Sequence, residues 1–133
     1  MSKTVELRKV VTGLLKTTGR EVFYENATNK AKFPYIVYEF DTVDFGNYGR
    51  DDIILTVNVW DRGSSSITVE TIADNIEKIL NNTNNPTDKV LPTFYITTRR
   101  SIRDEDESIR RRELTFSIQN YYIGEWLNVR ENE

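Results

Sequence analysis

The chain has 133 residues, of which 38% are hydrophobic and 29% charged, values typical of one folded domain with a single core. The absence of histidine and cysteine excludes Ser-His and Cys-His nucleophile pairs, imidazole and thiolate metal sites, and disulfides. The formal net charge of −3 disfavours binding to a phosphate backbone, so a nucleic-acid role would need a local basic patch.

The N-terminal segment predicts a helix in a protein that is not exported. Charged residues occupy Met1 to Lys9, where a signal peptide has its apolar run, and the sequence contains no apolar segment long enough to cross a membrane. From Thr4 to Thr17 the apolar residues recur at helical spacing. We expect the face formed by Leu7, Val10 and Leu14 to enter the core.

The next segment predicts strands. Glu21 to Tyr24 has the composition of a short strand, and Tyr35 to Val43 and Asp52 to Asp61 alternate between apolar and polar residues. The two longer runs are joined by a glycine-rich turn, which favours an antiparallel hairpin. Phe45 and Tyr48 are large side chains at the tip of this turn, so we interpret them as candidate interface residues.

A second helix follows the serine-rich segment Ser64 to Ser66, which offers oxygens for an N-cap. Its apolar stripe includes Val69, Ile72 and Ile76, which we expect to pack on the sheet. The helix ends before the polar cluster Asn81 to Pro86, because these residues disfavour helix.

Two further strands, about Thr93 to Ile102 and Ile109 to Ile123, form a second hairpin. Hairpins with helices set apart from them indicate an α+β fold, with an antiparallel sheet of two hairpins and a short strand packed against two helices. We expect one domain over residues 1–127 and a polar C-terminal tail over residues 128–133.

The second hairpin is unusual in charge, because six arginines flank four consecutive acids. The arginines are Arg99, Arg100, Arg103, Arg110, Arg111 and Arg112. One interpretation is a solvated hairpin whose strands pair internally by charge. The other is a docking arm, since guanidinium groups suit bidentate contacts with carboxylates across an interface.

Strand alternation favours the docking arm. It places Arg100 on the same face as Phe94 and Ile96, and Arg110 and Arg112 on the face of the apolar residues of the other strand. Unpartnered guanidinium groups do not fit in a core, so we expect the hairpin to project past it. Reversal of these three arginines to Glu is then expected to block assembly and leave the domain folded.

Asp51-Asp52 and Asp104 to Glu107 are the carboxylate clusters of the sequence. Both lie at expected turns and lack the alternating pattern of oxygen ligands of a calcium-binding loop. This favours solvent-exposed turns over a metal-binding site or a pair of catalytic acid and base residues. We therefore predict no catalytic, cofactor-binding or metal-binding residues, and no enzymatic activity. A Mg²⁺-dependent enzyme using Asp104 and Asp106 is the least favoured alternative.

Several landmarks together resemble a known family. They are the run Lys32-Phe33-Pro34-Tyr35-Ile36-Val37-Tyr38, the strand Leu55 to Asp61, and the serine-capped helix with Ile72, Ile76 and Leu80. In length, element order and these landmarks, the chain resembles the tail completion, or tail terminator and tail-to-head joining, proteins of long-tailed bacteriophages. The family has no catalytic residues to transfer onto this chain.

The resemblance implies a structural virion protein at the head-proximal end of the tail, assembled in the host cytoplasm. Such a protein caps the tail tube, ends its growth and joins the neck as a homohexameric ring, with DNA passing through the lumen without sequence-specific binding. The implied partners are other copies of the chain, the tail tube protein and a head-completion or neck protein, and no membrane. The family gives the arginine hairpin no assigned counterpart, and the strand alternation described above is the basis for expecting it to bind carboxylates of an adjacent subunit or tail ring, with DNA phosphates in the lumen as the rival. The alternatives are another neck or connector protein, and a generic protein-interaction domain.

Overall fold

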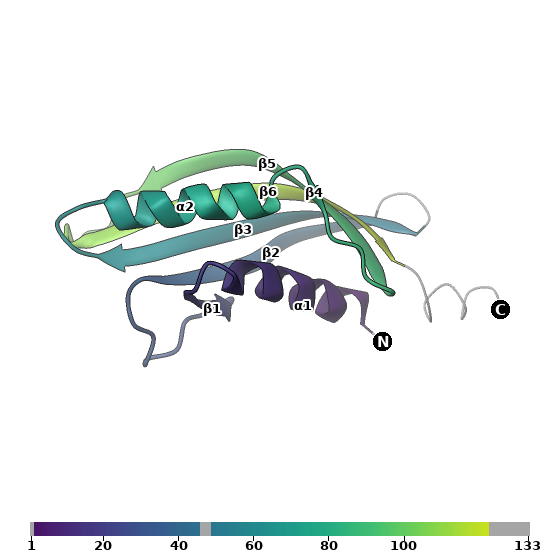
Figure 1. Ribbon diagram of the computed structural model, residues 1–133, viewed down its shortest axis with the longest axis horizontal. Helices are drawn as coiled ribbons and strands as arrows, with labels where there is room; N and C mark the ends of the chain where they lie inside the picture. Colours follow the sequence, from purple (N-terminus) through teal and green to yellow (C-terminus); the bar gives the residue numbers. More distant parts are fainter. Residues whose placement is uncertain (1, 46–48, 123–133) are drawn as a thin grey trace.

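Two helices and six strands make up the fold in the computed structural model, which describes residues 2–45 and 49–122 (Figure 1). In chain order they are α1 (Lys3–Lys16), β1 (Glu21–Tyr24), β2 (Tyr35–Phe45), β3 (Arg50–Arg62), α2 (Ile67–Leu80), β4 (Thr83–Asn84), β5 (Val90–Ile102) and β6 (Ile109–Tyr122). Every element except β4 is predicted by the sequence. The fold is α+β, and the expected C-terminal tail and the domain boundary at residue 127 lie outside the described residues.

The strands form one six-stranded sheet in the order β1-β2-β3-β6-β5-β4. β2 pairs antiparallel with β3, β5 pairs antiparallel with β6, and the antiparallel pairing of β3 with β6 joins the two pairs. β1 pairs parallel with β2, so the sheet is mixed, and the prediction of an antiparallel sheet is wrong at this edge. The polar connection over residues 25–34 is long enough to return the chain to the end of the sheet where β1 begins.

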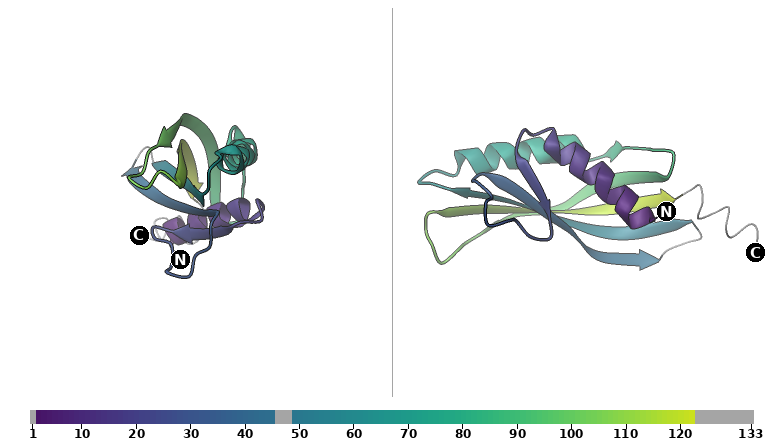
Figure 2. Two further views of the ribbon diagram at one scale, coloured as in Figure 1. Left: turned by 90° about the vertical axis from the view of Figure 1, so that its left-hand side faces the viewer. Right: turned by 90° about the horizontal axis from the view of Figure 1, so that it is seen from below.

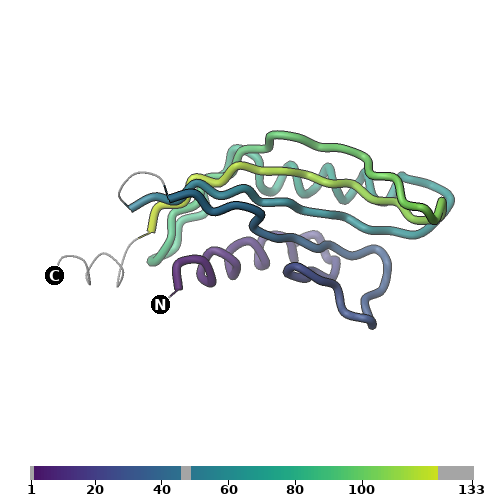
Figure 3. The backbone as a smooth tube through the Cα atoms, turned by 180° about the vertical axis from the view of Figure 1, so that it is seen from behind, coloured from purple at the N-terminus to yellow at the C-terminus, as the bar shows by residue number. Residues whose placement is uncertain are grey.

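Both helices contribute to one core on one face of the sheet, which curls into a half-barrel around them (Figure 2). Seen from the opposite side, the four long strands stand in front of α2 (Figure 3). Neither helix is long and apolar enough to cross a membrane within the part of the chain that the structure describes.

The residues that α1 buries differ from those predicted. Leu7, Val11 and Leu15 are fully buried, whereas Val10 and Leu14 are half-buried. The apolar stripe of α1 is wide enough to face the core through either the predicted residues or the set at i, i+4 and i+8. Packing against α2 and β1 selects the second set. The prediction is confirmed for Leu7, and Leu14 packs against the core while half-buried. The prediction is wrong for Val10, which is not part of the core, because the buried face is turned by about one residue around the helix.

The predicted face of α2 is confirmed. Val69, Ile72 and Ile76 are buried, and they pack with the inward-facing residues of the central strands. Those strand residues are Ile53, Leu55, Val57 and Val59 of β3 and Leu114, Phe116 and Ile118 of β6. A single core therefore lies between the sheet and the two helices.

The asparagine-rich segment after α2 runs alongside the start of β5. The backbone N–H groups of Asn82 and Asn85 donate to the carbonyls of Phe94 and Pro92, and the side-chain oxygen of Asn81 accepts from the N–H of Ile96. This segment includes β4, which covers the outer edge of β5 only at its beginning.

Candidate interaction surface

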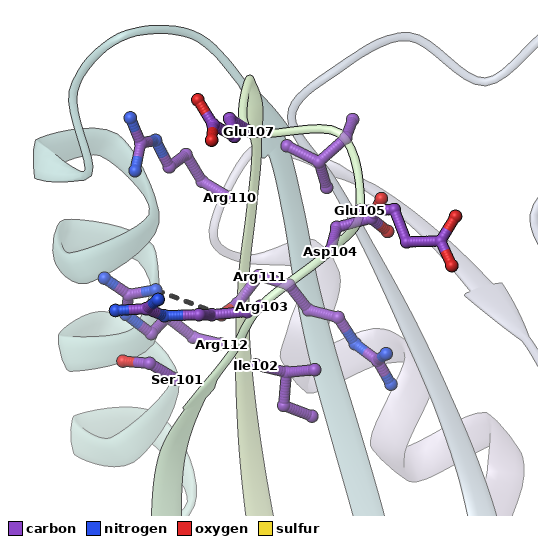
Figure 4. A pocket seen from close by; sticks show the side chains of 10 residues that line it. Ser101, Ile102, Arg103, Asp104, Glu105, Glu107, Arg110, Arg111 and Arg112 are labelled. Carbon is purple, nitrogen blue, oxygen red and sulfur yellow. Dashed lines mark hydrogen bonds between the residues drawn. The ribbon is translucent and has the colours of Figure 1, made fainter.

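The arginine hairpin ends in a hollow of about 600 Å³, lined by residues between Ser101 and Arg112 of both arms and the turn (Figure 4). Arg110 and Arg112 lie on the side of α2. Arg111, which lies between them in β6, points to the opposite face of the sheet. The candidate arginines therefore divide between the two faces, and each face has its own contacts.

A β-bulge decides which face each arginine of β5 occupies. The register between β5 and β6 shifts between Ile96 and Thr98, so the residues beyond it exchange faces. Arg99 lies opposite Leu114 on the helix-covered face, and Arg100 lies opposite Glu113 on the other face. The prediction that Arg100 continues the apolar face is wrong, because strict alternation does not survive an extra residue.

Arg99 and Arg112 bind α2 of the same chain. Arg99 Nη1 lies 2.6 Å from an oxygen of Asp74, and Arg99 Nη2 lies 3.2 Å from an oxygen of Glu70. Arg112 Nε donates to the other carboxylate oxygen of Glu70. Burial lowers the pKa of Arg99, but the hydrogen bond to Asp74 and the charges of Asp74 and Glu70 outweigh this effect and raise it. Glu70 of α2 is thus bound by one arginine from β5 and one from β6.

Arg110 binds the loop that precedes α2. Its Nε and Nη2 each lie 3.1 Å from a carbonyl oxygen, those of Gly63 and Ser64 respectively. The guanidinium groups on this face therefore have partners within the chain. The expectation that the hairpin projects from the domain assumed that these groups were unpartnered, so that argument for a projecting arm does not hold. A further role of these arginines in contacts with another protein stays a prediction.

On the helix-free face, Arg100 and Arg111 share one carboxylate. Arg100 Nη2 lies 2.8 Å from one oxygen of Glu113, and Arg111 Nη2 lies 3.6 Å from the other. Arg111 also donates to the side-chain oxygen of Asn58 at 2.9 Å, and its guanidinium lies 4.5 Å from the ring centre of Trp60. Arg111 is thereby held in place, whereas the Arg100 side chain remains 66% exposed.

Aromatic rings extend this surface across the sheet. The rings of Trp60 and Tyr35 are stacked with centres 6.5 Å apart, and Phe23 meets Tyr35 edge-on at 6.0 Å. These rings come from three neighbouring strands, so they form a continuous row on the helix-free face.

The acidic turn of the hairpin is organised by its own hydrogen bonds. One oxygen of Asp106 accepts from the N–H and the hydroxyl of Ser108 at 2.9 and 2.7 Å, and the other lies 3.6 Å from Arg62. The hydrogen bonds to Ser108, followed by the charge of Arg62, lower the pKa of Asp106. An oxygen of Asp104 accepts from the N–H of Asp106. In residues 2–45 and 49–122, no three acidic side chains are grouped as metal ligands would be.

The other predicted interface residues have different surroundings. Phe45 ends β2 with 81% of its surface exposed, and Lys3 Nζ lies 5.4 Å from its ring centre. Tyr48 lies outside the described residues. Arg103 is exposed in the turn after β5.

Sequence reasoning missed a cluster of acids on β2. Glu39, Asp41 and Asp44 are exposed along the strand, and Asp41 accepts a hydrogen bond from the hydroxyl of Thr56. Partial burial, followed by the charges of Asp41, Glu25 and Glu113, raises the pKa of Glu39. Counting acids within the strand that the sequence already predicts would have identified this cluster.

The described surface is thus one of charged and aromatic contacts, as in a protein that binds other macromolecules. The family model of tail completion protein gp17 matches residues 3–119. The chain therefore belongs to the tail completion protein gp17 family and is a structural protein of a virion tail. Its membership favours a non-enzymatic role.

Comparison with solved structures gives the same fold. A chain in the virion of a native gene transfer agent (GTA) particle superposes with a TM-score of 0.64 and 14% sequence identity. The match covers 81% of this chain and 84% of that chain. No curated protein matches the sequence.

Proposed function

We propose that the protein caps the head-proximal end of the tail tube, ends tube growth, and joins the tail to the head as a ring. The observation that carries this proposal is the family match over residues 3–119, since the family is described as one of tail completion proteins. The ring is a homohexamer that contacts the tail tube protein on one side and a head-completion or neck protein on the other. It assembles in the host cytoplasm, and DNA passes through its lumen without sequence-specific binding.

The positions of the candidate interfaces support contacts with two different neighbours. Phe45 lies opposite Asp51 at one end of the sheet, whereas the turn of the arginine hairpin follows Ile102 and precedes Ile109, which lies opposite Arg62 at the other end. A subunit whose strands run between the tube and the neck would present one end to each. We propose Phe45 and Tyr48 for one contact. We propose the arginine hairpin for contacts at the other end and with the adjacent subunit, through Arg99, Arg100, Arg103, Arg110, Arg111 and Arg112.

The experiment is to assemble particles without this protein and examine the tails by electron microscopy. The proposal predicts tubes of uncontrolled length that carry no head, and both defects are expected to disappear when the purified protein is supplied during assembly. Tubes of normal length that fail to join heads would instead identify another neck or connector protein. Normal joined particles would contradict both functions.

A further inference from the structure

Two strands of the sheet have long outer edges that no other strand of the described chain covers. β1 pairs with β2 only over Tyr35–Tyr38, which leaves residues 39–45 without a neighbour on that side. β4 pairs with β5 only at Thr93 and Phe94, and residues 97–102 have no strand neighbour on theirs. Each free segment is six or seven residues long, which is roughly 20 Å of strand. β2 and β5 bound the four long strands in Figure 3.

The two free segments carry opposite charge. Residues 39–45, the acidic edge, contain Glu39, Asp41 and Asp44, and no Lys or Arg nitrogen of the described residues lies within 4.0 Å of these three carboxylates. The acids lie close enough that their mutual repulsion contributes to the raised pKa of Glu39. A cationic neighbour would relieve this repulsion.

Residues 97–102, the basic edge, contain Arg99 and Arg100 and are followed at once by Arg103. Arg99 is turned toward α2, whereas the Arg100 side chain is largely exposed although its guanidinium also pairs with Glu113. Arg103 is exposed as well. The basic edge therefore offers two accessible guanidinium groups.

Charges and bulges on edge strands also serve to prevent aggregation, and both edges contain a bulge. Protection of that kind is most effective when the two edges carry the same sign, because copies then repel in every pairing. Here the signs are opposite, so the β2 edge of one copy attracts the β5 edge of another. The charge pattern favours pairing between unlike edges and disfavours pairing of either edge with itself.

The strand directions suit the same pairing. β2, β3, β6 and β5 are each antiparallel to the next, so β2 and β5 run in opposite directions. The two free segments lie toward opposite ends of the sheet, because Asp44 is level with Thr93 and Arg100 is level with Val37 across the ladder. A second copy in the same orientation, shifted along the strands by roughly five to seven residues or about 20 Å, therefore brings the acidic edge beside an antiparallel basic edge. Repetition of this head-to-tail contact around an axis to which the strands are inclined gives a closed ring.

We propose that the acidic edge of β2 in one copy pairs with the basic edge of β5 in the next copy as an antiparallel strand addition. The backbone hydrogen bonds of the new ladder supply affinity, and the contacts of Glu39 and Asp44 with Arg100 and Arg103 set the choice of edge. The partner is a second copy of this chain. The inference rests on the proposed ring and states how its subunits are joined.

A charge exchange tests this pairing. One variant carries Glu39→Lys and Asp44→Lys, a second carries Arg100→Glu and Arg103→Glu, and a third carries all four substitutions. Asp41 is kept because it accepts the hydrogen bond from Thr56, and Glu113 retains Arg111 as a partner when Arg100 is changed. The three variants are supplied during assembly of particles that lack the protein, and heads joined to tails are counted by electron microscopy.

Each double variant has two edges of the same sign, so we expect at least a roughly tenfold loss of joined particles from either one alone. An equal mixture of the two double variants restores opposite signs at every contact, and so does the fourfold variant alone; both are expected to return joined particles to within about threefold of wild type. In a mixture with wild type, the fourfold variant meets only like-charged edges, so we expect the two proteins to segregate into separate rings.

The outcomes separate this inference from the proposed function. Full activity of both double variants, or failure of both the mixture and the fourfold variant while each protein keeps the thermal midpoint of wild type, would overturn the edge pairing. Wild-type protein that restores neither tube length nor head joining would overturn the proposed function instead. If either double variant unfolds, matched variants with Gln at the same positions replace it, and they are expected to assemble with a smaller dependence on salt concentration than wild type; an unchanged salt dependence would also overturn the pairing.

Discussion

Reversal of Arg112 tests whether the arginine hairpin belongs to the folded domain. Arg112 Nε donates to Glu70 of α2, and the Arg112 side chain is 15% exposed. Arg112→Glu removes this hydrogen bond and places two carboxylates side by side. We expect the isolated domain to lose stability, in contrast to the expectation from sequence that the hairpin tolerates reversal.

The size of the loss follows from the surroundings of the pair. A hydrogen bond between charged groups contributes about 1.5–3 kcal/mol, and two like charges 4 Å apart repel by about 4 kcal/mol at an effective dielectric constant of 20. Glu70 is 45% exposed, so water screens most of the repulsion and the side chain turns away from it. We therefore expect a total loss of about 2–4 kcal/mol, which is a fall in thermal midpoint of roughly 10 °C for a domain of this size.

The assay is thermal and urea unfolding of purified wild type and Arg112→Glu, followed by circular dichroism. Arg103→Glu is the matched control, because Arg103 is exposed in the turn and we expect its reversal to change the free energy of unfolding by less than about 0.5 kcal/mol. Equal midpoints for Arg112→Glu and Arg103→Glu would show that the contact between Arg112 and Glu70 does not stabilise the domain and that the hairpin behaves as a separate arm.

Three further predictions concern the core, the acidic edge and the tip of β2. Ile76 is fully buried, so Ile76→Ala should lower the free energy of unfolding by about 2–5 kcal/mol in urea titration; an unchanged midpoint would contradict its place in the core. Because the pKa of Glu39 is raised above 4.5 on folding, its stabilising effect is complete below pH 4.5 and is lost as the pH rises through the folded value. Glu39→Gln should therefore unfold at a higher urea concentration than wild type at pH 7, and the gap should close below pH 4.5; a gap that does not depend on pH would contradict this. Phe45→Ala should leave stability within about 0.5 kcal/mol of wild type but reduce the number of joined particles, and undiminished joining would exclude Phe45 from the interface.

The strands and helices were accessible from the sequence because each buries one face, and the alternation or helical spacing of apolar residues records that face. β4 was missed because its two residues are too few to show a period and lie in an asparagine-rich segment that reads as a loop. The parallel pairing of β1 depends on the path of residues 25–34, which local patterns do not specify. The orientation of α1 was set by neighbours, since Val10 and Val11 are equally apolar.

The candidate surface was predicted in part. The arginine hairpin was identified because its charge is dense, and the pairing of Arg100 with Glu113 agrees with strands that pair internally by charge. The bulge near Thr97 was invisible in the sequence, since no residue in that stretch requires an unusual backbone, and it reversed the faces of Arg99 and Arg100. The acidic edge was overlooked because its residues read as the solvated face of a strand, and only the sheet order reveals that this strand has a free edge.

Electron cryomicroscopy of completed particles would locate the protein within the tail. We expect one ring of six copies, related by a rotation axis, between the last ring of the tail tube and the neck, with β2 of each copy beside β5 of the next. Density for the protein along the tube, at the distal end of the tail, or as a single copy at the neck would contradict this expectation.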